Sequence, residues 1–443
     1  MNHESAKQML VEFQESQFPR AVARDLSVPL DTGRVASITG VRRSGKTYLL
    51  LTLAESLVRA GVPKQRLAYI SFDDPRLLPA TARELAELPD VCRELFPDDR
   101  GPRYLFLDEV QQVEDWELGV RRIHDTRRFS LAVTGSSSRM LSGDIATSLR
   151  GRSLTFELLP FSARECLRSQ GVAIDRLTTH SVRRADVRRV LAAYFTFGGF
   201  PEVVLADEDS MRLRILGEYV ETMFMRDLVE RNRVRNPAAM RELFRFIVTN
   251  VANLFSANAF WKWLRSVHPL TKRTLLQYVS HLEDSGLVFL VRKFSHSLKE
   301  QNLRPRKAYL VDNGLRTVYG LSPSHDRGRV LENSVYLGLR QHLNHSPLAR
   351  LNYWQESKGR EVDFVVTDGG KVRALIQVAS DPTAFGVKER ETSALVTALA
   401  EFRLKHGLVI TSDHSGKERV EGRTIHYVPF WKWVLAEDLL TPA

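Results

Sequence analysis

A glycine-rich segment near the N-terminus constrains the fold of this chain more than any other feature. The apolar run Val35–Thr39 predicts a buried strand, and a helical pattern begins near Lys46. Between them lies the spacing Gly40-x4-Gly45-Lys46-Thr47. Glycines let successive backbone amides turn inward, and the helix N-terminus adds partial positive charge at the same point. The segment therefore predicts a phosphate-binding loop, or P-loop, rather than an ordinary glycine-rich turn that opens a helix.

The side chains of this loop have distinct expected roles. Lys46 is expected to reach the β and γ phosphates of ATP, and the Thr47 hydroxyl is expected to ligate Mg²⁺. ATP and Mg²⁺ are therefore the expected cofactors. The residues expected around the nucleotide are Gly40, Val41, Arg42, Arg43, Ser44, Gly45, Lys46, Thr47 and Tyr48.

The bulk properties of the chain exclude several other classes of protein. Its 443 residues are enough for about three domains, and 43% hydrophobic with 26% charged residues is ordinary for a soluble globular protein. No apolar run reaches the length needed to span a bilayer, and the first residues lack the form of a signal peptide. Two cysteines, Cys92 and Cys166, make neither a disulfide framework nor a zinc site by themselves. We therefore expect a cytoplasmic protein without a membrane partner.

The first third of the chain contains five short apolar runs separated by helical patterns. We expect strands over residues 35–39, 67–72, 104–109, 129–134 and 153–158. Strands that alternate with helices are typical of an α/β unit whose sheet is mainly parallel. From about residue 162 to residue 237 the pattern becomes helical, and after residue 314 it returns to mixed α/β character.

The third of these strands ends in two acids, Asp108 and Glu109. An apolar strand that ends this way, downstream of a P-loop, predicts a Walker B element. Asp108 is expected to hold Mg²⁺ through water, and Glu109 is expected to polarise the water that attacks the γ phosphate. Taken alone, two acids after a strand are usually only solvated.

Two further features predict residues that act on the γ phosphate. The fourth strand ends in a serine-rich turn, in which Ser136 or Ser137 is expected to contact this phosphate or its water. Before the fifth strand, Arg152 is our first candidate and Arg150 our second for an arginine finger that stabilises charge in a neighbouring subunit's site. The alternatives are a plain serine turn and surface salt bridges.

Several motifs together resemble one family. They are Gly40-Val-Arg-Arg-Ser-Gly-Lys-Thr47, Leu107-Asp-Glu-Val-Gln111, Gly135-Ser-Ser137, Gly151-Arg-Ser153 and Phe197-Gly-Gly-Phe-Pro-Glu202. In this order, and over nearly the whole chain, they resemble the bacterial and archaeal AAA-type P-loop ATPases that carry a C-terminal domain of unknown function. The resemblance implies an AAA+ core with a parallel sheet over residues 1–160, a helical lid over residues 161–236, and homo-oligomers such as rings. It implies no substrate.

Positive charge is concentrated in one window of the chain. Residues 231–310 contain 15 Lys and Arg against 4 Asp and Glu, an excess equal to the net charge of +11 of the whole chain. This window therefore predicts a polyanionic partner, DNA in duplex or branched form. The alternative is a solvated basic face with no partner.

The elements expected in this window resemble a winged helix-turn-helix over residues 237–318. Three helical patterns are followed by two strands, over 288–294 and 308–312, joined by a basic tip. In such a module the third helix enters the major groove and the wing contacts phosphates, although winged helices also bind proteins. The expected DNA contacts are Lys272, Arg273, Gln277, Arg304, Arg306 and Lys307.

The remaining α/β segment, residues 319–443, resembles a restriction-endonuclease-like domain. Such nucleases bind Mg²⁺ with a helical Glu, a strand Asp and a Glu-x-Lys on the next strand. Glu332, Asp363 and Gln377 stand at the positions of the three metal-binding acids, while Ala379 stands at the position of the lysine. A neutral amide binds a hard cation more weakly than a carboxylate does. We therefore expect a degenerate nuclease site.

These inferences combine into one expected function and two alternatives. The chain is expected to be a Mg²⁺-dependent AAA+ ATPase that binds DNA and couples hydrolysis to its remodelling or translocation. One alternative is a slowly hydrolysing nucleotide switch that recruits protein partners. The other is an ATP-gated nuclease in which a displaced lysine, Lys371 or Lys388, replaces the missing one.

Overall fold

A computed structural model describes the chain over residues 3–97, 103–136, 149, 151–172, 183–321, 327–356, 359–382 and 387–441. The chain divides into two compact units, Met1–Leu159 and Pro160–Ala443. Each unit is described by itself below.

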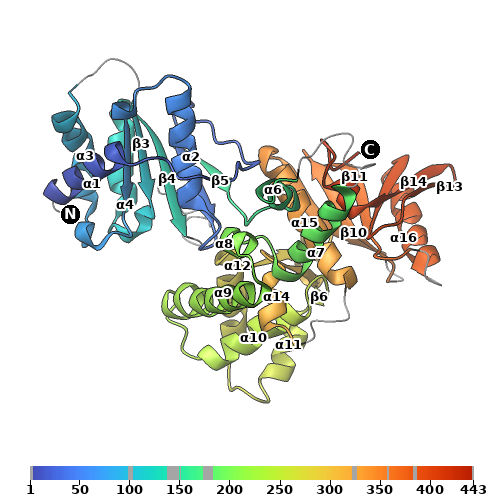
Figure 1. The fold of residues 1–443 in the computed structure, drawn as a ribbon. Helices are drawn as coiled ribbons and strands as arrows, with labels where there is room; N and C mark the ends of the chain where they lie inside the picture. Colours follow the sequence, from blue (N-terminus) through green and yellow to red (C-terminus); the bar gives the residue numbers. More distant parts are fainter. Residues whose placement is uncertain are drawn as a thin grey trace. The chain divides into compact units, whose positions relative to one another are not determined.

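The first unit is built on a five-stranded sheet in which every pairing is parallel (Figure 1). The strand order β2-β3-β4-β1-β5 places β4 between the strand that leads into the P-loop and the strand that ends in Asp108. The strands are β1 (Val35–Gly40), β2 (Leu67–Ser71), β3 (Arg103–Asp108), β4 (Phe129–Ser136) and β5 (Ser153–Glu157). Because all five run the same way, their carboxyl ends meet at one edge of the sheet, where ligands of such sheets bind.

Helices cover both faces of this sheet, which explains why its strands are nearly continuous apolar runs. Leu105 and Leu107 of β3 pack into a core with helices α3 and α4, whereas Phe106, which points to the opposite face, packs with α2. Figure 1 shows α2 on one side of the sheet and α3 and α4 on the other. The helices of the unit are α1 (His3–Glu15), α2 (Lys46–Arg59), α3 (Ala82–Leu95) and α4 (Trp116–Asp125).

The second unit begins with a helical region. Its elements are α6 (Ala163–Ser169), α7 (Arg183–Phe197), α8 (Pro201–Leu205), α9 (Asp209–Thr222) and the π-helical turn η5 (Met223–Glu230). The Phe197–Pro201 segment connects α7 to α8, and its Gly199 amide donates a hydrogen bond of 2.6 Å to the buried Asp312 carboxylate. Burial raises the pKa of Asp312 to about 7, although backbone amides from Gly199 and Gly314 oppose this.

Three helices and a small sheet follow. The elements are α10 (Pro237–Thr249), β6 (Leu254–Phe255), α11 (Ala257–Leu264), α12 (Lys272–Asp284), β7 (Val288–Val291), α13 (Leu298–Leu303), β8 (Arg306–Leu310) and α14 (Gly314–Tyr319). The sheet order is β6-β8-β7, with antiparallel pairs. Thr271 caps α12, because its side chain accepts a hydrogen bond from the Thr274 amide.

The connection between β7 and β8 differs from the predicted basic-tipped hairpin. It contains α13, and Lys307 belongs to β8, where it pairs with Val291. Because side chains alternate along a strand, Lys307 and Tyr309 share one face of β8, and both are buried. The prediction that Lys307 lies at an exposed tip is therefore wrong.

The unit ends in a six-stranded mixed sheet of order β13-β14-β12-β11-β10-β9. Its strands are β9 (Ala349–Gln355), β10 (Glu361–Asp368), β11 (Lys371–Val378), β12 (His406–Thr411), β13 (Gly416–Val420) and β14 (Arg423–Pro429). Helix α16 (Val387–Glu401) packs on one face, and α15 (Arg327–His342) contacts β11 and β8. A short helix, α17 (Phe430–Trp433), follows the last strand. Within the described ranges of the whole chain, no helix combines the length and apolar character that crossing a membrane requires.

Candidate functional site

The P-loop connects β1 to α2 with the two glycines in different roles. Gly45 precedes the first helical residue with a φ of 96°, a conformation that residues with a side chain rarely adopt. Gly40 has no such backbone angle. A Cβ atom there would lie 2.2 Å from the carbonyl oxygen of Leu158, so any side chain is excluded by the close approach of the segment after β5. The expectation that both glycines serve unusual backbone angles therefore holds for Gly45 alone.

Lys46 lies at the centre of the loop and is 4% exposed. Its Nζ donates hydrogen bonds of 3.2 Å to the carbonyl oxygens of Gly40 and Val41 and lies 3.4 Å from Glu109 Oε1. The ammonium group thus bridges the P-loop and the end of β3. Among the other expected nucleotide contacts, Val41 and Ser44 are buried, Arg42 is half-buried, and Arg43 and Tyr48 are exposed.

Asp108 is buried at the end of β3 and accepts hydrogen bonds from three hydroxyl groups. Thr47 Oγ1 and Tyr69 OH donate to Oδ2 over 2.6 and 2.9 Å, and Thr134 Oγ1 donates to Oδ1. Burial raises the pKa of Asp108 above its ordinary value, while the hydroxyl groups oppose this rise. The structure therefore brings together the two predicted Mg²⁺ ligands, Thr47 and Asp108.

Glu109 follows in a left-handed backbone conformation, with φ at 52°. Residues with a side chain adopt this region at a cost of roughly 1–2 kcal/mol. Its amide donates a hydrogen bond of 2.9 Å to Thr134 Oγ1, which fixes the turn. Burial opposes ionisation of Glu109, but Lys46, Gln111 and Arg42 together outweigh burial and hold its pKa below the ordinary value. The carboxylate is thus charged and placed beside the P-loop lysine, as a base that polarises water requires.

Two residues of this site, Thr134 and Tyr69, were not predicted from the sequence. Thr134 is fully buried on β4, between the P-loop strand and β3, and contacts both Asp108 and Glu109. A threonine directly after the apolar run Leu131–Val133 was the available signal. The predicted Ser136 pairs through its backbone with Gly40, but its side chain lies outside the described residues, as do Ser137 and Arg150.

The predicted arginine finger, Arg152, lies at the start of β5. Its carbonyl accepts a hydrogen bond from the Val35 amide, at the beginning of β1. Strand β1 runs from this edge of the sheet to the P-loop, and at about 3.3 Å per residue its length is roughly 17 Å. The Arg152 side chain is paired with Asp125, with 2.8 Å between Nε and Oδ1. Arg152 is therefore remote from the P-loop of its own chain, and a role in a neighbouring copy stays a prediction.

The residues present fit ATP and Mg²⁺. The N-terminus of α2 and Lys46 supply positive charge and donors, which phosphate groups require. A threonine hydroxyl and a carboxylate, from Thr47 and Asp108, are hard oxygen ligands within 2.6 Å of each other. Mg²⁺ is commonly held by one or two such protein groups together with substrate phosphates. Ser44 Oγ, buried in the loop, has no hydrogen-bond partner among the described residues, which leaves one more polar group for a ligand.

The predicted DNA contacts divide into two groups. Lys272, Arg273 and Gln277 are exposed on α12, and Arg304 is exposed after α13. Arg306 is half-buried, and its Nη1 donates to both carboxylate oxygens of Glu283, over 3.0 and 2.9 Å. Lys307 is 1% exposed and cannot reach a phosphate group in this conformation.

Lys307 instead lies at the centre of the predicted nuclease site. Its Nζ is 2.6 Å from Asp363 Oδ1, 2.9 Å from Glu332 Oε1 and 2.8 Å from Glu361 Oε1. Burial alone would lower the pKa of Lys307, but the surrounding carboxylates outweigh burial and raise it well above the ordinary value. Burial and the charge of Asp363 raise the pKa of Glu332 to about 8. We call Lys307, Glu332, Glu361 and Asp363 the Lys307 cluster.

Further hydrogen bonds complete the Lys307 cluster. Tyr309 OH donates to Glu332 Oε1 over 2.7 Å, and the Val378 amide donates to Asp363 Oδ2 over 2.8 Å. Gln377 Oε1 accepts a hydrogen bond of 3.1 Å from the Asp363 amide, so the predicted residues Glu332, Asp363 and Gln377 do meet. In the described part of the chain, no group of three or more His, Cys, Asp or Glu side chains is arranged to hold a metal ion.

The two lysines considered as replacements are not seen in the Lys307 cluster. Lys371 lies at the start of β11, whereas Gln377 lies near its end. At about 3.3 Å per residue they are roughly 20 Å apart along the strand. The side chain of Lys388 lies outside the described residues. Ala379 is buried just after β11 and offers no polar group.

Three family models match the chain. One described as an AAA domain matches residues 32–167, which contain the parallel sheet and the P-loop, and this confirms the predicted AAA-type core. Two described as domains of unknown function, DUF8612 and DUF4143, match residues 188–325 and 327–433. The latter two descriptions name no fold or activity, so the winged-helix and nuclease-like assignments stay predictions.

Relatives of similar length are known. An uncharacterised protein of Methanocaldococcus jannaschii is 32% identical over 425 residues, which cover 94% of this chain and 91% of that protein. An uncharacterised protein of Haemophilus influenzae is 26% identical over 406 residues, which cover 90% and 94%. Among solved structures, a Walker-type ATPase of Pyrococcus abyssi is similar with a TM-score of 0.41 and 13% identity, over 72% of this chain and 95% of that one.

Proposed function

The chain belongs to the family of the Methanocaldococcus jannaschii protein, with an AAA-type P-loop ATPase domain followed by two domains of unknown function, and from this premise we propose that it is a Mg²⁺-dependent ATPase that couples hydrolysis to the remodelling or translocation of DNA. The observation that best supports the ATPase part is the convergence of Lys46, Thr47, Asp108 and Glu109 at the carboxyl edge of one parallel sheet. In such an arrangement catalysis consists mainly of positioning and charge stabilisation.

Each side chain then has one task. Lys46 and the N-terminus of α2 would hold the phosphates, while Thr47 and Asp108 would hold Mg²⁺, which neutralises phosphate charge when bound. Glu109 polarises the attacking water and accepts its proton. Thr134 fixes the Glu109 amide and so orients the carboxylate.

ATP turnover of the full chain tests this assignment. Glu109→Gln removes the base but keeps the shape, so turnover should fall by about 10²–10⁴-fold while nucleotide binding persists. Lys46→Ala should reduce nucleotide binding itself. Glu114→Gln, the same change at an exposed position five residues away, serves as the control. Unchanged turnover in both Glu109→Gln and Lys46→Ala would rule out this site as the site of hydrolysis.

The DNA part of the proposal is supported by helix α12 and its surroundings. The order α10, β6, α11, α12, β7, α13, β8 resembles that of a winged helix-turn-helix, with α13 inserted between the two strands of the wing. Helix α12 is its third helix, and it exposes Lys272, Arg273 and Gln277. Other basic residues of this region are engaged in ion pairs, Arg241 with Glu221 and Lys293 with Glu300. The exposed residues of α12 are therefore the proposed contacts to DNA.

DNA binding measured over a series of salt concentrations tests this part. Lys272→Gln and Arg273→Gln should each weaken binding and reduce the slope of log affinity against log salt by about one. Lys417→Gln removes an exposed charge from β13, away from α12 in the chain, and should change neither quantity. If DNA fails to bind or to stimulate ATP turnover at low salt, the nucleotide switch that recruits protein partners becomes the better description.

We also propose that copies of the chain assemble so that Arg152 of one copy meets the P-loop of another. Arg152 lies at the opposite edge of its own sheet from the P-loop, so any action on a γ phosphate would be on that of another copy, and the alternative is a surface salt bridge with Asp125. Lys46→Ala and Arg152→Ala proteins, each with low turnover alone, should regain activity when mixed, because some sites then combine an intact P-loop with an intact arginine. Lack of any recovery in a mixture shown to exchange subunits would contradict this arrangement.

A further inference from the structure

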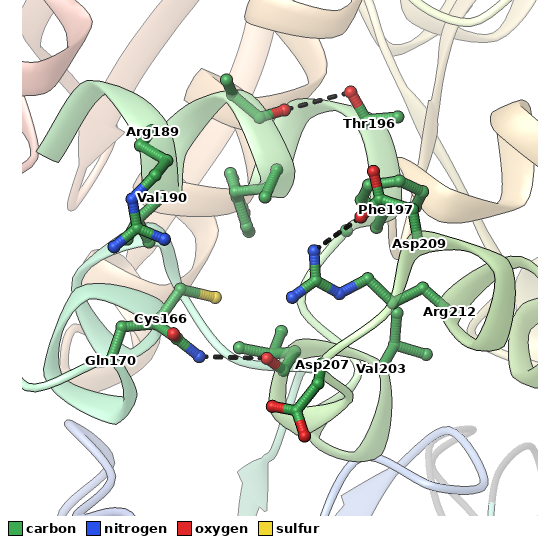
Figure 2. Close-up of a pocket in the computed structure, with 15 residues that line it drawn as sticks. Cys166, Gln170, Arg189, Val190, Thr196, Phe197, Val203, Asp207, Asp209 and Arg212 are labelled. Carbon is green, nitrogen blue, oxygen red and sulfur yellow. Dashed lines mark hydrogen bonds and ion pairs between the residues drawn. The ribbon is translucent and has the colours of Figure 1, made fainter. Parts of the chain in front are cut away.

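Two cavities of nearly equal volume lie among the described residues of the second unit. One, of 480 Å³, is lined by residues of α6, α7, α8 and α9, and we call it the α6–α9 cavity (Figure 2). The other, of 490 Å³, is lined by residues of α7, α14, α15 and α17 and by Ser412 and Asp413, and we call it the α7–α17 cavity. Both volumes lie in the range of small-molecule sites, about 300–1,000 Å³. Their charges and hydrogen bonds differ.

The polar groups of the α6–α9 cavity are balanced. Arg189 and Arg212 line it together with Asp207 and Asp209. In Figure 2 the Arg212 guanidinium points toward the middle of the cavity, and its Nη1 donates to Asp209 over 2.9 Å. Its Nε donates to the Ala206 carbonyl, and Gln170 donates to the Val204 carbonyl. We therefore do not expect this cavity to select a charged ligand.

The α7–α17 cavity carries an excess of positive charge. Among the described residues that line it, Arg188, Arg316 and Arg327 are basic and Asp413 alone is acidic. Arg188 pairs with Asp413 over 2.5 Å. Arg316 is only 6% exposed, which places its charge in the wall rather than in open solvent. Guanidinium groups in such a setting favour phosphate or carboxylate.

An unsatisfied donor in the same wall also favours an acceptor. Trp431 lines the α7–α17 cavity and is 8% exposed, and its indole Nε1–H has no hydrogen-bond partner among the described residues. Indole offers a donor only, and a buried donor without an acceptor costs about 1–3 kcal/mol. A ligand oxygen would remove this cost. Phe195, Leu331 and Phe430 form an apolar part of the wall, and the uncharged polar residues of the lining are Thr196, Asn313, Thr317 and Ser412.

We propose that the α7–α17 cavity binds a small organic phosphate, of the size of a nucleoside monophosphate. Its arginines and the Trp431 N–H meet the phosphate oxygens, and its apolar wall meets the body of the ligand. This site is separate in sequence from the P-loop and is formed wholly within the second unit. Through this site a small molecule would bind to and regulate the second unit independently of the P-loop.

Calorimetric titration of the full-length Lys46→Ala protein tests the proposal, because this background weakens nucleotide binding at the P-loop. The probes are the four ribonucleoside monophosphates and inorganic phosphate. At least one monophosphate should bind at a single site. Arg188→Gln and Trp431→Phe should each weaken this binding by roughly tenfold to a hundredfold, the range expected for a hydrogen bond to a charged group.

Arg189→Gln is the matched control. It removes the same charge from the adjacent residue of α7, which lines the α6–α9 cavity instead, and should leave binding unchanged. Arg327→Gln, at an exposed lining position, provides a further variant if Trp431→Phe does not fold. The proposal is overturned if no probe binds up to millimolar concentration, or if Arg188→Gln and Arg189→Gln behave alike. Equal affinity for inorganic phosphate would overturn the role given to the apolar wall.

Discussion

Lys307 Nζ and Asp363 Oδ1 lie 2.6 Å apart in a part of the protein from which water is nearly excluded. The two residues belong to segments matched by different family models, 188–325 and 327–433. Glu332 and Glu361 approach the same ammonium group. The Lys307 ammonium group is thus a buried cation that already pairs with Glu332 and Asp363, the acids at the positions where a nuclease binds metal. We infer that the Lys307 cluster holds these two segments together.

Replacement of Lys307 should therefore be strongly destabilising. Lys307→Met keeps the length of the side chain but leaves buried carboxylates without their cation, and removing one partner of a buried ion pair costs about 3–5 kcal/mol. Five of the six tryptophans, Trp261, Trp263, Trp354, Trp431 and Trp433, belong to the second unit. Urea unfolding followed by tryptophan fluorescence therefore reports mainly on the unit that contains the cluster.

Lys299→Met, at an exposed position of α13, is the control for Lys307→Met and should change the midpoint little. In the double variant Lys307→Met/Asp363→Asn one of the unpaired charges is also removed. Its loss of stability should be smaller than the sum of the two single losses. Additive losses would mean that the two side chains do not interact as described.

The Lys307 cluster should also make stability depend on pH. The pKa of Glu332 is raised to about 8 from an ordinary 4.5, because the group is buried near Asp363. Between these pH values the folded protein keeps a proton that the unfolded chain has released. Stability should therefore fall as pH rises from about 4.5 to about 8, by up to about 1.4 kcal/mol per pH unit. Asp312, with its pKa raised to about 7, acts in the same direction.

Glu332→Gln isolates the contribution of this group. Glutamine cannot ionise, so the decrease in stability between about pH 4.5 and 8 should become smaller in this variant, while the part that arises from Asp312 persists. The measurement is a set of urea transitions at several pH values. A pH dependence identical to that of the unsubstituted protein would show that Glu332 does not titrate in this range.

The nucleotide part of the protein could be predicted from local patterns. The five strands of the first unit begin and end within about two residues of their expected positions, because strands covered on both faces are continuous apolar runs. The P-loop and the Asp108–Glu109 pair also lie together as predicted, since parallel strands bring their carboxyl ends to one edge. These features are determined by residues close together in the sequence and by a topology that many parallel-sheet proteins share.

The Lys307 cluster could not be predicted in this way. From composition alone, a lysine is expected at the surface. Lys307 is buried because acids 25 and 56 residues further along the chain pair with it. The pairing of β8 with β7 was predicted, but β8 begins at Arg306 rather than at residue 308, so Lys307 lies within the sheet and not in the connection. Long-range partners of this kind are set by tertiary packing and leave no local period in the sequence.

Thr134 provides a test within the ATPase domain. Thr134→Val keeps the shape of the side chain but removes the hydroxyl that accepts from the Glu109 amide and donates to Asp108. The Glu109 amide would then be buried without a partner, which costs about 1–3 kcal/mol. We expect ATP turnover to fall while nucleotide binding changes little. Thr134→Ser, which restores the hydroxyl, should recover much of the turnover, and failure of this rescue would point to packing of the methyl group instead.

Two glycine-to-alanine substitutions should have opposite effects on stability. At Gly40 a Cβ atom would lie 2.2 Å from the Leu158 carbonyl oxygen, so the backbone of the P-loop must shift. Overpacking of this kind typically costs about 1–3 kcal/mol. Nucleotide binding should weaken together with stability, because the same loop forms the phosphate site. At Gly217, inside α9, a Cβ atom would meet nothing within 4 Å, and the backbone has no positive φ.

Gly217→Ala should therefore stabilise the protein by about 0.5–1 kcal/mol, since alanine loses less conformational freedom in a helix than glycine does. Thermal unfolding of both variants, beside nucleotide titrations, checks the pair. The two substitutions add the same single methyl group, so only its surroundings differ. If Gly40→Ala proved as stable as the unsubstituted protein and bound nucleotide equally well, the segment after β5 would have to lie farther from the P-loop than it does here.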